Sequence, residues 1–276
     1  MIKIKICVTG NSTFAGKNFV ERFKDKYEIK PISDDIFLEE CDAIINFHAL
    51  IEAPHSLLYP MQHFKENIEK TMHLLEATRR LKTKPHFIQP SSNLIYGNPI
   101  YTPIDEKHPL NPQSPYAATR ICQEMLAMSY YNSFGLPVTI LRLSNGYGPH
   151  GTGVINQFIK NAKEGKPLII KGGFQTRTFT HIYDFCDAIV LALENPNSIG
   201  NIFNISGPET IPIDKLAELI RDFFFPNAEI KGGDFDKGDI TSNNFKISHE
   251  KAKSLLGYKH EFDLIKGIQQ VIDYEG

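Results

Sequence analysis

The sequence predicts an α/β fold, doubly wound around a mainly parallel sheet, with a smaller part towards the C-terminal end. Two observations predict it. Residues 2–8 alternate apolar and polar side chains as a strand does, and a loop with two glycines then leads into a helical pattern. Up to residue 149 strand-like and helix-like segments alternate, whereas the pattern beyond residue 149 is mixed.

The larger part is expected to span residues 1–149 and to take back a returning segment at about 178–206. Apolar runs predict its strands, and apolar residues at helical spacing predict its two long helices. The third strand follows the second so closely that the usual helix between them is largely missing. The expected strands after the first cover 28–32, 43–47, 86–89, 138–143 and 201–205, and the long helices cover 61–82 and 115–134.

The smaller part is expected to combine residues 150–177 and 207–276. Helical patterns at 154–164 and 213–224 flank a short strand pattern at 168–171. A further helix, opened by Asp184 and ending near residue 195, belongs with the returning segment, and Asp184 is expected to be structural.

Bulk composition excludes several classes of protein. The 276 residues carry a formal charge of −2 and no run of lysine or arginine, so a nucleic-acid partner is not expected. No apolar run reaches the length needed to cross a membrane, and the cytoplasm is the expected location. The cysteines lack the spacing of a disulfide framework or a metal site, so no metal is expected; they are Cys7, Cys41, Cys122 and Cys186.

A tyrosine and a cation one helical turn apart suggest chemistry. Tyr116 and Arg120 share a face of the helix expected at 115–134. A free tyrosine has a pKa of about 10, so it is almost entirely neutral at pH 7. A fixed cation in a poorly solvated cleft favours the phenolate, which would let Tyr116 act as acid or base. The alternative is an ordinary surface contact between the two side chains.

Two further stretches accompany this pair, namely Val-Thr-Gly-Asn-Ser-Thr-Phe-Ala-Gly at 8–16 and Pro-Ser-Ser-Asn-Leu-Ile-Tyr-Gly at 90–97. Together with 114–123 they resemble the extended short-chain dehydrogenase/reductases, specifically the NAD-dependent epimerase/dehydratase family, over nearly the whole chain. The resemblance implies a Rossmann-type fold, a bound NAD, with NADP as the alternative, and a nucleotide-sugar substrate. This chain departs from the family pattern twice, because Thr13 replaces a glycine and Arg120 replaces a lysine.

Dinucleotide binding is expected at the loop after the first strand, where backbone N–H groups and a helix N-terminus receive a pyrophosphate. The loop residues assigned to the cofactor are Gly10, Ser12, Thr13, Phe14 and Gly16. The Thr13 side chain narrows the approach to phosphate, although its hydroxyl could donate a hydrogen bond instead. The alternative is that this loop is only a turn and binds no ligand.

Five other positions are assigned to the cofactor, namely the catalytic pair Tyr116 and Arg120, and Asp34, Asp35 and Asn67. Asp34 or Asp35, about twenty residues after the loop, is placed to hold the adenosine ribose, unless both only cap a helix. No arginine lies beside them, which favours NAD over NADP. Asn67 matches a family asparagine that supports the site, and it could equally be a satisfied core amide.

The resemblance also implies a substrate site. Asn145 is expected to contact the sugar nucleotide or to form a turn, and Arg177 to grip its diphosphate or to form a surface ion pair. Lys237 stands near the place of a missing family arginine. Asn93 and Leu94 occupy the positions at which dehydrating and decarboxylating members carry an acid, so elimination of water is not expected here.

The expected function is epimerisation of a nucleotide sugar by hydride transfer at a sugar carbinol. Ser92, with Ser91 as the second choice, would hydrogen-bond the hydroxyl, Tyr116 would accept its proton and Arg120 would hold Tyr116 ionised. A keto-sugar reductase and a binding protein with weakened catalysis remain as alternatives. The helices at 61–82 and 115–134 are expected to pair with their copies in a homodimer, with Met125, Met128, Tyr130 and Tyr131 at the interface.

Overall fold

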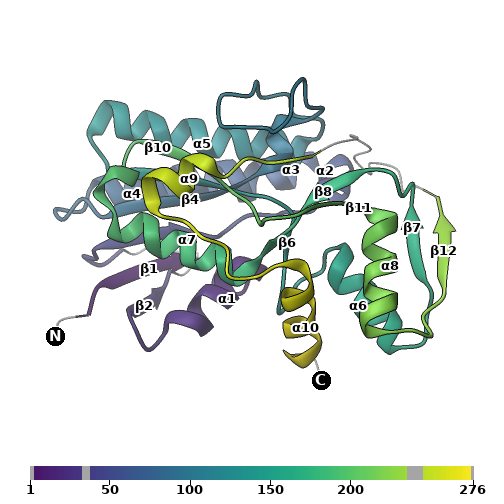
Figure 1. Cartoon of the computed structure of the whole chain (residues 1–276). Coiled ribbons are helices and arrows are strands. Elements are labelled where there is room, and N and C mark those ends of the chain that lie inside the picture. Colours follow the sequence, from purple (N-terminus) through teal and green to yellow (C-terminus); the bar gives the residue numbers. More distant parts are fainter. Residues whose placement is uncertain (1–2, 33–37, 235–244, 275–276) are drawn as a thin grey trace.

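The structure is a computed structural model that describes residues 3–32, 38–234 and 245–274. Six strands of these residues form one parallel sheet in the order β10-β5-β4-β3-β1-β2 (Figure 1). The predicted α/β fold with a parallel sheet is therefore confirmed. The strands of the sheet are β1 (Lys5–Thr9), β2 (Glu28–Pro31), β3 (Ala43–Asn46), β4 (His86–Ser92), β5 (Val138–Leu143) and β10 (Asn201–Ile205).

Helices cover both faces of this sheet (Figure 1). On one face, α1 (Phe14–Phe23) and α7 (Ile182–Glu194) pack together over a core that includes Ile6, Phe19 and Phe185. On the other, α4 (Lys70–Arg79) packs beside α5 (Pro115–Phe134) over a core that includes Leu74 and Phe87. The bounds of α5 are those that the sequence predicts.

The sheet order reverses at β1, which lies between β2 and β3. The connections that leave β1 and β3 therefore run to opposite faces, and a crevice forms outside the carboxyl ends of these strands. Helix α1 follows β1 on one side. On the other side, β3 leads to the short helices α2 (Ala53–Leu58) and α3 (Pro60–His63).

The helix expected at 61–82 is not regular. Between α3 and α4, residues Phe64–Glu69 form a π-helix, the segment η1. The three helical segments follow one another directly, with no loop between them. Strand β4 also continues further than expected and carries Ser91 and Ser92 at its end. A single 3₁₀ turn, η2 (Asn93–Tyr96), follows it.

Elements after residue 149 build a second hydrophobic cluster beside the sheet (Figure 1). Helices α6 (Val154–Lys163), α8 (Ile213–Phe224) and α10 (Leu264–Tyr274) enclose it together with small two-stranded sheets. Apolar side chains at helical spacing, among them Phe158, Leu216 and Ile268, meet in its centre. The short strands of this part and its rim are β6 (Gly146–Tyr147), β7 (Leu168–Lys171), β8 (Thr176–Thr178), β9 (Thr180–His181), β11 (Thr210–Pro212) and β12 (Ile230–Gly233).

One segment lies elsewhere than the expected division placed it. Helix α9 (Glu250–Leu256) packs against β10 and α7, so it belongs with the sheet rather than with the smaller part. Ala252, Leu256 and Tyr258 are buried in the cluster beneath α7. Burial of these apolar side chains draws the tail back over the sheet before α10 returns to the smaller part.

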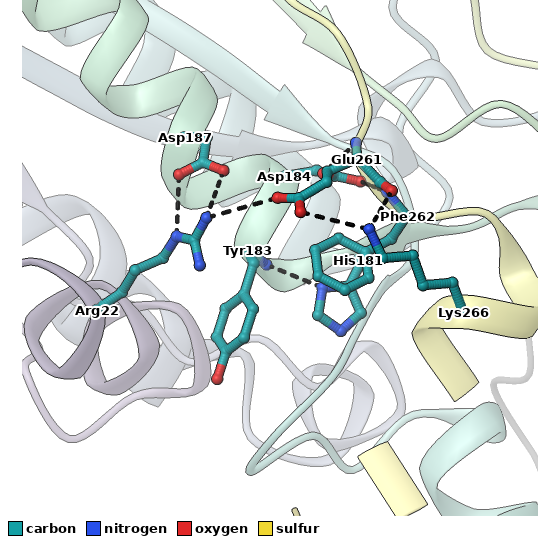
Figure 2. Close-up of polar contacts among 8 residues, drawn as sticks. All are labelled: Arg22, His181, Tyr183, Asp184, Asp187, Glu261, Phe262 and Lys266. Carbon is teal, nitrogen blue, oxygen red and sulfur yellow. Dashed lines mark hydrogen bonds and ion pairs between the residues drawn. The ribbon is translucent and has the colours of Figure 1, made fainter. Parts of the chain in front are cut away.

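A polar cluster at the start of α7 fixes that return (Figure 2). The buried carboxylate of Asp184 accepts the backbone N–H of Glu261 at 2.7 Å and that of Phe262 at 3.4 Å. The ring of His181 stacks on Phe262 with 4.0 Å between centroids. Desolvation raises the pKa of Asp184 to about 6 and lowers that of His181 to about 4. Asp184 therefore has the structural role expected for it.

Candidate active site

The turn after β1 is shaped by two glycines. Gly10 has a φ of 59°, and a Cβ there would lie 2.7 Å from the backbone nitrogen of His48. A Cβ on Gly16 would lie 2.1 Å from the carbonyl oxygen of Gly10. Both positions therefore exclude a side chain, as expected for a loop that brings backbone close to a ligand and a helix close to its strand.

Thr13 begins α1 as its N-cap. Its hydroxyl donates to the carbonyl oxygen of Gly10 at 2.7 Å and accepts the N–H of Gly16 at 3.2 Å. The hydroxyl hydrogen is thus already used within the loop, and the role considered for it, donation to a phosphate, would require this bond to break. The backbone N–H groups at the start of α1 remain the phosphate donors of the turn.

A cleft of about 210 Å³ opens beside this turn, at the carboxyl ends of the strands. Thr13, Phe14 and Ala15 form one end, and the end of β4 forms its floor. The cleft brings together eight of the residues that the sequence singles out; they are Thr13, Phe14, Ser91, Ser92, Asn93, Tyr116, Arg120 and Asn145. Ser12 is exposed and does not line it.

Tyr116 lies in the first turn of α5, which Ser114 caps by accepting the N–H of Ala117 at 3.2 Å. The tyrosine is only 5% exposed. Its ring meets that of His63 edge to face at 6.2 Å. Among the described residues its hydroxyl has no hydrogen-bond partner, so it can form one with a ligand in the cleft.

Ser92 lies opposite, at the end of β4. Its hydroxyl oxygen accepts the N–H of Leu94 at 3.2 Å and so caps the turn η2. The hydroxyl hydrogen is left for an oxygen in the cleft. The apolar side chains of Leu94, Ile51 and Leu143 line the cleft as well.

Arg120 is placed one turn after Tyr116, as the spacing predicts, but its guanidinium is bonded elsewhere. Nη1 donates to Oε1 of Gln123 at 2.7 Å, and Nη2 donates to the carbonyl oxygen of Pro90. Among the described residues Arg120 has no hydrogen bond to Tyr116. The expected pair shares one cleft, yet the cation is tied to the end of β4 and to its own helix.

Three buried polar atoms around the cleft lack a partner among the described residues. They are Oγ of Ser91, Nδ2 of Asn93 and Nε of Arg120. Unpaired buried donors and acceptors destabilise a fold, and they mark places where a ligand completes the hydrogen bonding. The glycine turn and these atoms fit a bound dinucleotide.

Asn67 supports this cleft from behind. Its amide oxygen accepts the N–H of Leu50 at 2.7 Å, and its amide nitrogen donates to the carbonyl oxygen of Leu50 and to the hydroxyl of Thr119. The side chain is fully buried and all its hydrogen-bonding groups are used. Asn67 therefore joins the wall after β3 to α5, and its side chain is the satisfied buried amide that the sequence left open as an alternative.

A second cleft of about 440 Å³ continues from Asn145 into the smaller part. Arg177 on β8 and Lys171 on β7 line it. The Arg177 guanidinium lies 5.4 Å from the ring centroid of Phe245, and burial lowers its pKa to about 10, so it stays charged at neutral pH. Asn145 has a left-handed φ of 28°, and its amide donates to the carbonyl oxygen of Thr178 at 3.1 Å.

The remaining candidates lie outside the described residues. They are Asp34 and Asp35, assigned to the ribose, and Lys237, assigned to the diphosphate. In the described part of the chain no group of three or more histidine, cysteine or acidic side chains could hold a metal ion. No helix of that part is long and apolar enough to span a membrane.

Sequence reasoning missed the polar residues that surround Arg120. Asn46, Thr71, Gln89 and Gln123 are all buried and all hydrogen-bonded to one another or to Arg120 and Pro90. Asn46 lies in an apolar stretch of a predicted strand, whereas Thr71 follows Lys70 and Gln123 precedes Glu124 in their predicted helices. A polar residue at a core position was the one available signal, because such a residue requires a buried partner.

The fold and this cleft define an α/β protein of the dinucleotide-binding class, with a serine and a tyrosine facing one crevice. The family model described as "NAD dependent epimerase/dehydratase family" matches residues 31–206. The chain belongs to this family, and the resemblance noted in its sequence is confirmed.

Relatives in the family carry several activities. The uncharacterized UDP-glucose epimerase YtcB of Bacillus subtilis is 35% identical over 75% of this chain and 66% of its own. The dTDP-glucose 4,6-dehydratase of Streptomyces antibioticus is 29% identical over 87% of this chain and 72% of its own. Among solved structures, the UDP-glucuronic acid 4-epimerase of Bacillus cereus, in complex with UDP-glucuronic acid and NAD, is 26% identical with a TM-score of 0.85 and covers 98% of both chains.

Proposed function

We propose that this protein is a nucleotide-sugar epimerase that uses a bound NAD and acts by hydride transfer at a sugar carbinol. One observation carries the proposal. Ser92, Tyr116 and three polar atoms without a partner among the described residues lie at one cleft that starts at the glycine turn, and a second cleft leads on from Asn145 to Arg177. Similar proteins are epimerases of UDP-sugars, which supports the same reaction class.

In the proposed complex, the backbone of the turn at Gly10 and the start of α1 hold the pyrophosphate. The donors of Asn93 and Arg120 that have no partner in the described part of the chain serve the nicotinamide half. The nicotinamide supplies reversible acceptance of a hydride. Ser92 donates a hydrogen bond to the sugar hydroxyl, and Tyr116 takes that hydroxyl's proton and later returns it. Arg177 and Lys171 attract the diphosphate of the sugar nucleotide.

The residues after Ser92 restrict the reaction. Elimination of water from a hexose requires a proton donor and acceptor beside the reacting carbons. Asn93 and Leu94 can neither release nor take up a proton at neutral pH. We therefore propose redox chemistry at the carbinol without elimination.

The position of Arg120 favours a second candidate, a protein that binds the nucleotide sugar and turns it over slowly or not at all. The guanidinium is bonded to Gln123 and Pro90, so its charge does not serve Tyr116 through a direct hydrogen bond. Catalysis by Tyr116 then depends on a rearrangement when ligands bind.

Two measurements test these candidates. Mass spectrometry of ligands released from the purified protein should detect NAD, since an epimerase keeps its cofactor through turnover. Incubation with UDP- and dTDP-hexoses should then give isomers of unchanged mass. A product lighter by one water would contradict the exclusion of elimination, and consumption of added NADH with a keto-sugar would show a reductase. Retained NAD without any product would favour the binding protein.

A further inference from the structure

The side chains around Arg120 form a closed ring of buried hydrogen bonds. From Arg120 the ring passes to Gln123, whose amide nitrogen donates to Oγ1 of Thr71 at 2.7 Å. Thr71 accepts from Nδ2 of Asn46 at 3.0 Å, and the same nitrogen donates to Oε1 of Gln89 at 2.9 Å. These residues come from α5, α4, β3 and β4.

The ring closes at a backbone carbonyl. Nε2 of Gln89 donates to the carbonyl oxygen of Pro90 at 2.8 Å, and this oxygen also accepts from Arg120. Pro90 lies beyond the last residue pair that β4 makes with β3, so its carbonyl is open to side chains on that side. Gln89 and Gln123 are fully buried, and Thr71 and Asn46 are each 2% exposed.

The ring holds the guanidinium by neutral groups alone. Gln123 and the Pro90 carbonyl take one N–H from each terminal nitrogen, which fixes the plane of the fork. Nε of Arg120 is then the buried donor left without a partner among the described residues. The second N–H of each terminal nitrogen also remains, and Arg120 lines the cleft, so these are the donors that the guanidinium has left for a bound ligand.

We propose that Gln123 is a positioning residue for Arg120. It holds the guanidinium against Pro90 so that Arg120 presents its remaining N–H groups to the cofactor in a fixed orientation, instead of acting as a mobile cation beside Tyr116. The inference rests on the proposed function, since it assumes that a dinucleotide lies in this cleft. It explains how the chain uses an arginine here, because the fork has enough donors to bind the ring and the ligand at once.

A lysine could not do the same. Its ammonium is a compact charge on a flexible stem without a fixed plane, and Gln123 would compete with the ligand for it. The effect of Gln123 is therefore expected to exist only while Arg120 is present. This dependence is what a double-mutant cycle measures.

The cycle uses Arg120→Lys, Gln123→Met and the double variant, with NADH binding followed by the fluorescence of NADH. Methionine keeps the volume of glutamine and removes its hydrogen bonds. Each single change is expected to weaken NADH binding about tenfold, and the double variant also about tenfold, because loss of either partner already loses the orientation. A hundredfold loss in the double variant would overturn the proposal.

ADP separates positioning from general damage. It carries the pyrophosphate and the adenosine half but neither the second ribose nor the nicotinamide, so its affinity, measured by calorimetry, should change less than about twofold in every variant. An equal loss of ADP and NADH binding in Gln123→Met would show a merely structural role and overturn the proposal. A wild-type protein that binds neither NADH nor NADPH would refute the proposed function and this inference together, whereas independent losses would refute the inference alone.

Thr71→Val provides a second variant that leaves both contacts of Arg120 in place. It removes the hydroxyl that anchors Gln123 and should weaken NADH binding about threefold. Thr78→Val is the matched control, because Thr78 lies two turns later on α4, is fully buried, and its hydroxyl bonds only the carbonyl oxygen of Leu74 among the described residues. Equal NADH binding by the two threonine variants would also count against the ring.

Discussion

Helix α5 has a buried arginine on each side, Arg142 and Arg120, and the two differ in whether a carboxylate pairs with them. On the side towards β5, Arg142 makes a two-pronged ion pair with Glu124, with contacts at 3.0 and 2.7 Å, and donates to the hydroxyl of Tyr96 at 2.8 Å. On the cleft side, Arg120 has two neutral partners, and its Nε has no partner among the described residues. Both are almost fully buried.

The difference separates a structural charge from a functional one. The Glu124 carboxylate compensates the charge of Arg142, and the pair raises the pKa of the Arg142 guanidinium above its ordinary value although burial alone lowers it. Nothing in the described protein compensates Arg120 in this way. A buried charge without a counterion destabilises a fold, so its presence indicates a ligand that completes it.

Breaking the ion pair between Arg142 and Glu124 should have the largest effect on stability. Arg142→Met leaves the Glu124 carboxylate buried without its partner and should lower the free energy of unfolding by about 4–5 kcal/mol. Urea unfolding measures the change. Arg120→Met is the matched control on the other side of α5, and it should change the free energy of unfolding by less than about 1 kcal/mol. Equal losses in the two variants would remove the distinction between the arginines.

A change in the cleft should affect turnover instead of stability. Tyr116→Phe removes a hydroxyl without a protein partner among the described residues, so stability should stay within about 0.5 kcal/mol of wild type. With the sugar nucleotide that the panel identifies, kcat should fall about 10³-fold, or about 4 kcal/mol in the barrier. Tyr131→Phe, on the same helix and outside the cleft, is the control. Unchanged turnover in Tyr116→Phe would refute the mechanism.

The polar cluster at the start of α7 contains two buried titratable groups, Asp184 and His181. Their contributions to stability should change with pH in opposite directions. Asp184, whose pKa is raised to about 6, stabilises the fold at low pH and loses this contribution as pH rises towards 6. His181, whose pKa is lowered to about 4, stabilises it above pH 6.5 and loses this contribution as pH falls towards 4. Each amounts to about 3 kcal/mol, so they largely cancel between pH 4 and 6.5.

Single variants should expose each slope. In Asp184→Asn the free energy of unfolding should rise with pH more steeply than in wild type between pH 4 and 6.5, and in His181→Gln it should fall relative to wild type. The measurement is urea unfolding across that range. Curves for Asp184→Asn that run parallel to wild type would contradict the assignment.

The smallest expected effect concerns the outer face of α4 and α5. Met72 on α4 and Met125 on α5 are exposed, as is Phe64 on the adjoining η1, so we propose this face as the homodimer interface. Tyr130 does not belong to it, because it is buried and its hydroxyl bonds Glu76, and Tyr131 packs against Gly200. Met125→Glu should weaken association at least about tenfold by sedimentation, or about 1.4 kcal/mol. A wild-type monomer at micromolar concentration would refute the dimer.

Much of the fold was predictable because it depends on local periodicity. The strand-helix alternation gave the parallel sheet, and Ser114 as a cap with Gly135 at the end bounded α5. The segments that build the cleft were predictable for the same reason, since each lies at the end of a strand or the start of a helix.

The partners within the site were not predictable in this way. Whether Arg120 faces Tyr116 or Gln123 depends on contacts between residues 46, 71, 89 and 123, which only the packing of four elements brings together. Asn67 likewise reads as a helix residue, while its orientation depends on Leu50, 17 positions away. The spacing of residues along a helix determines which of them share a face. The hydrogen-bond partner of a long side chain depends on tertiary contacts as well.

The π-helical stretch Phe64–Glu69 has a consequence for the ancestry of the chain. A π-helical turn closes its hydrogen bond over five residues instead of four, so it holds one residue more than the matching turn of an α-helix. Here the π-helical turn carries Asn67. Helix α4 follows it and places Thr71 in the ring of hydrogen bonds around Arg120. We therefore expect relatives with a regular helix to show a one-codon gap at 64–69. Deleting one residue there would rotate His63 by about 100° relative to Thr71.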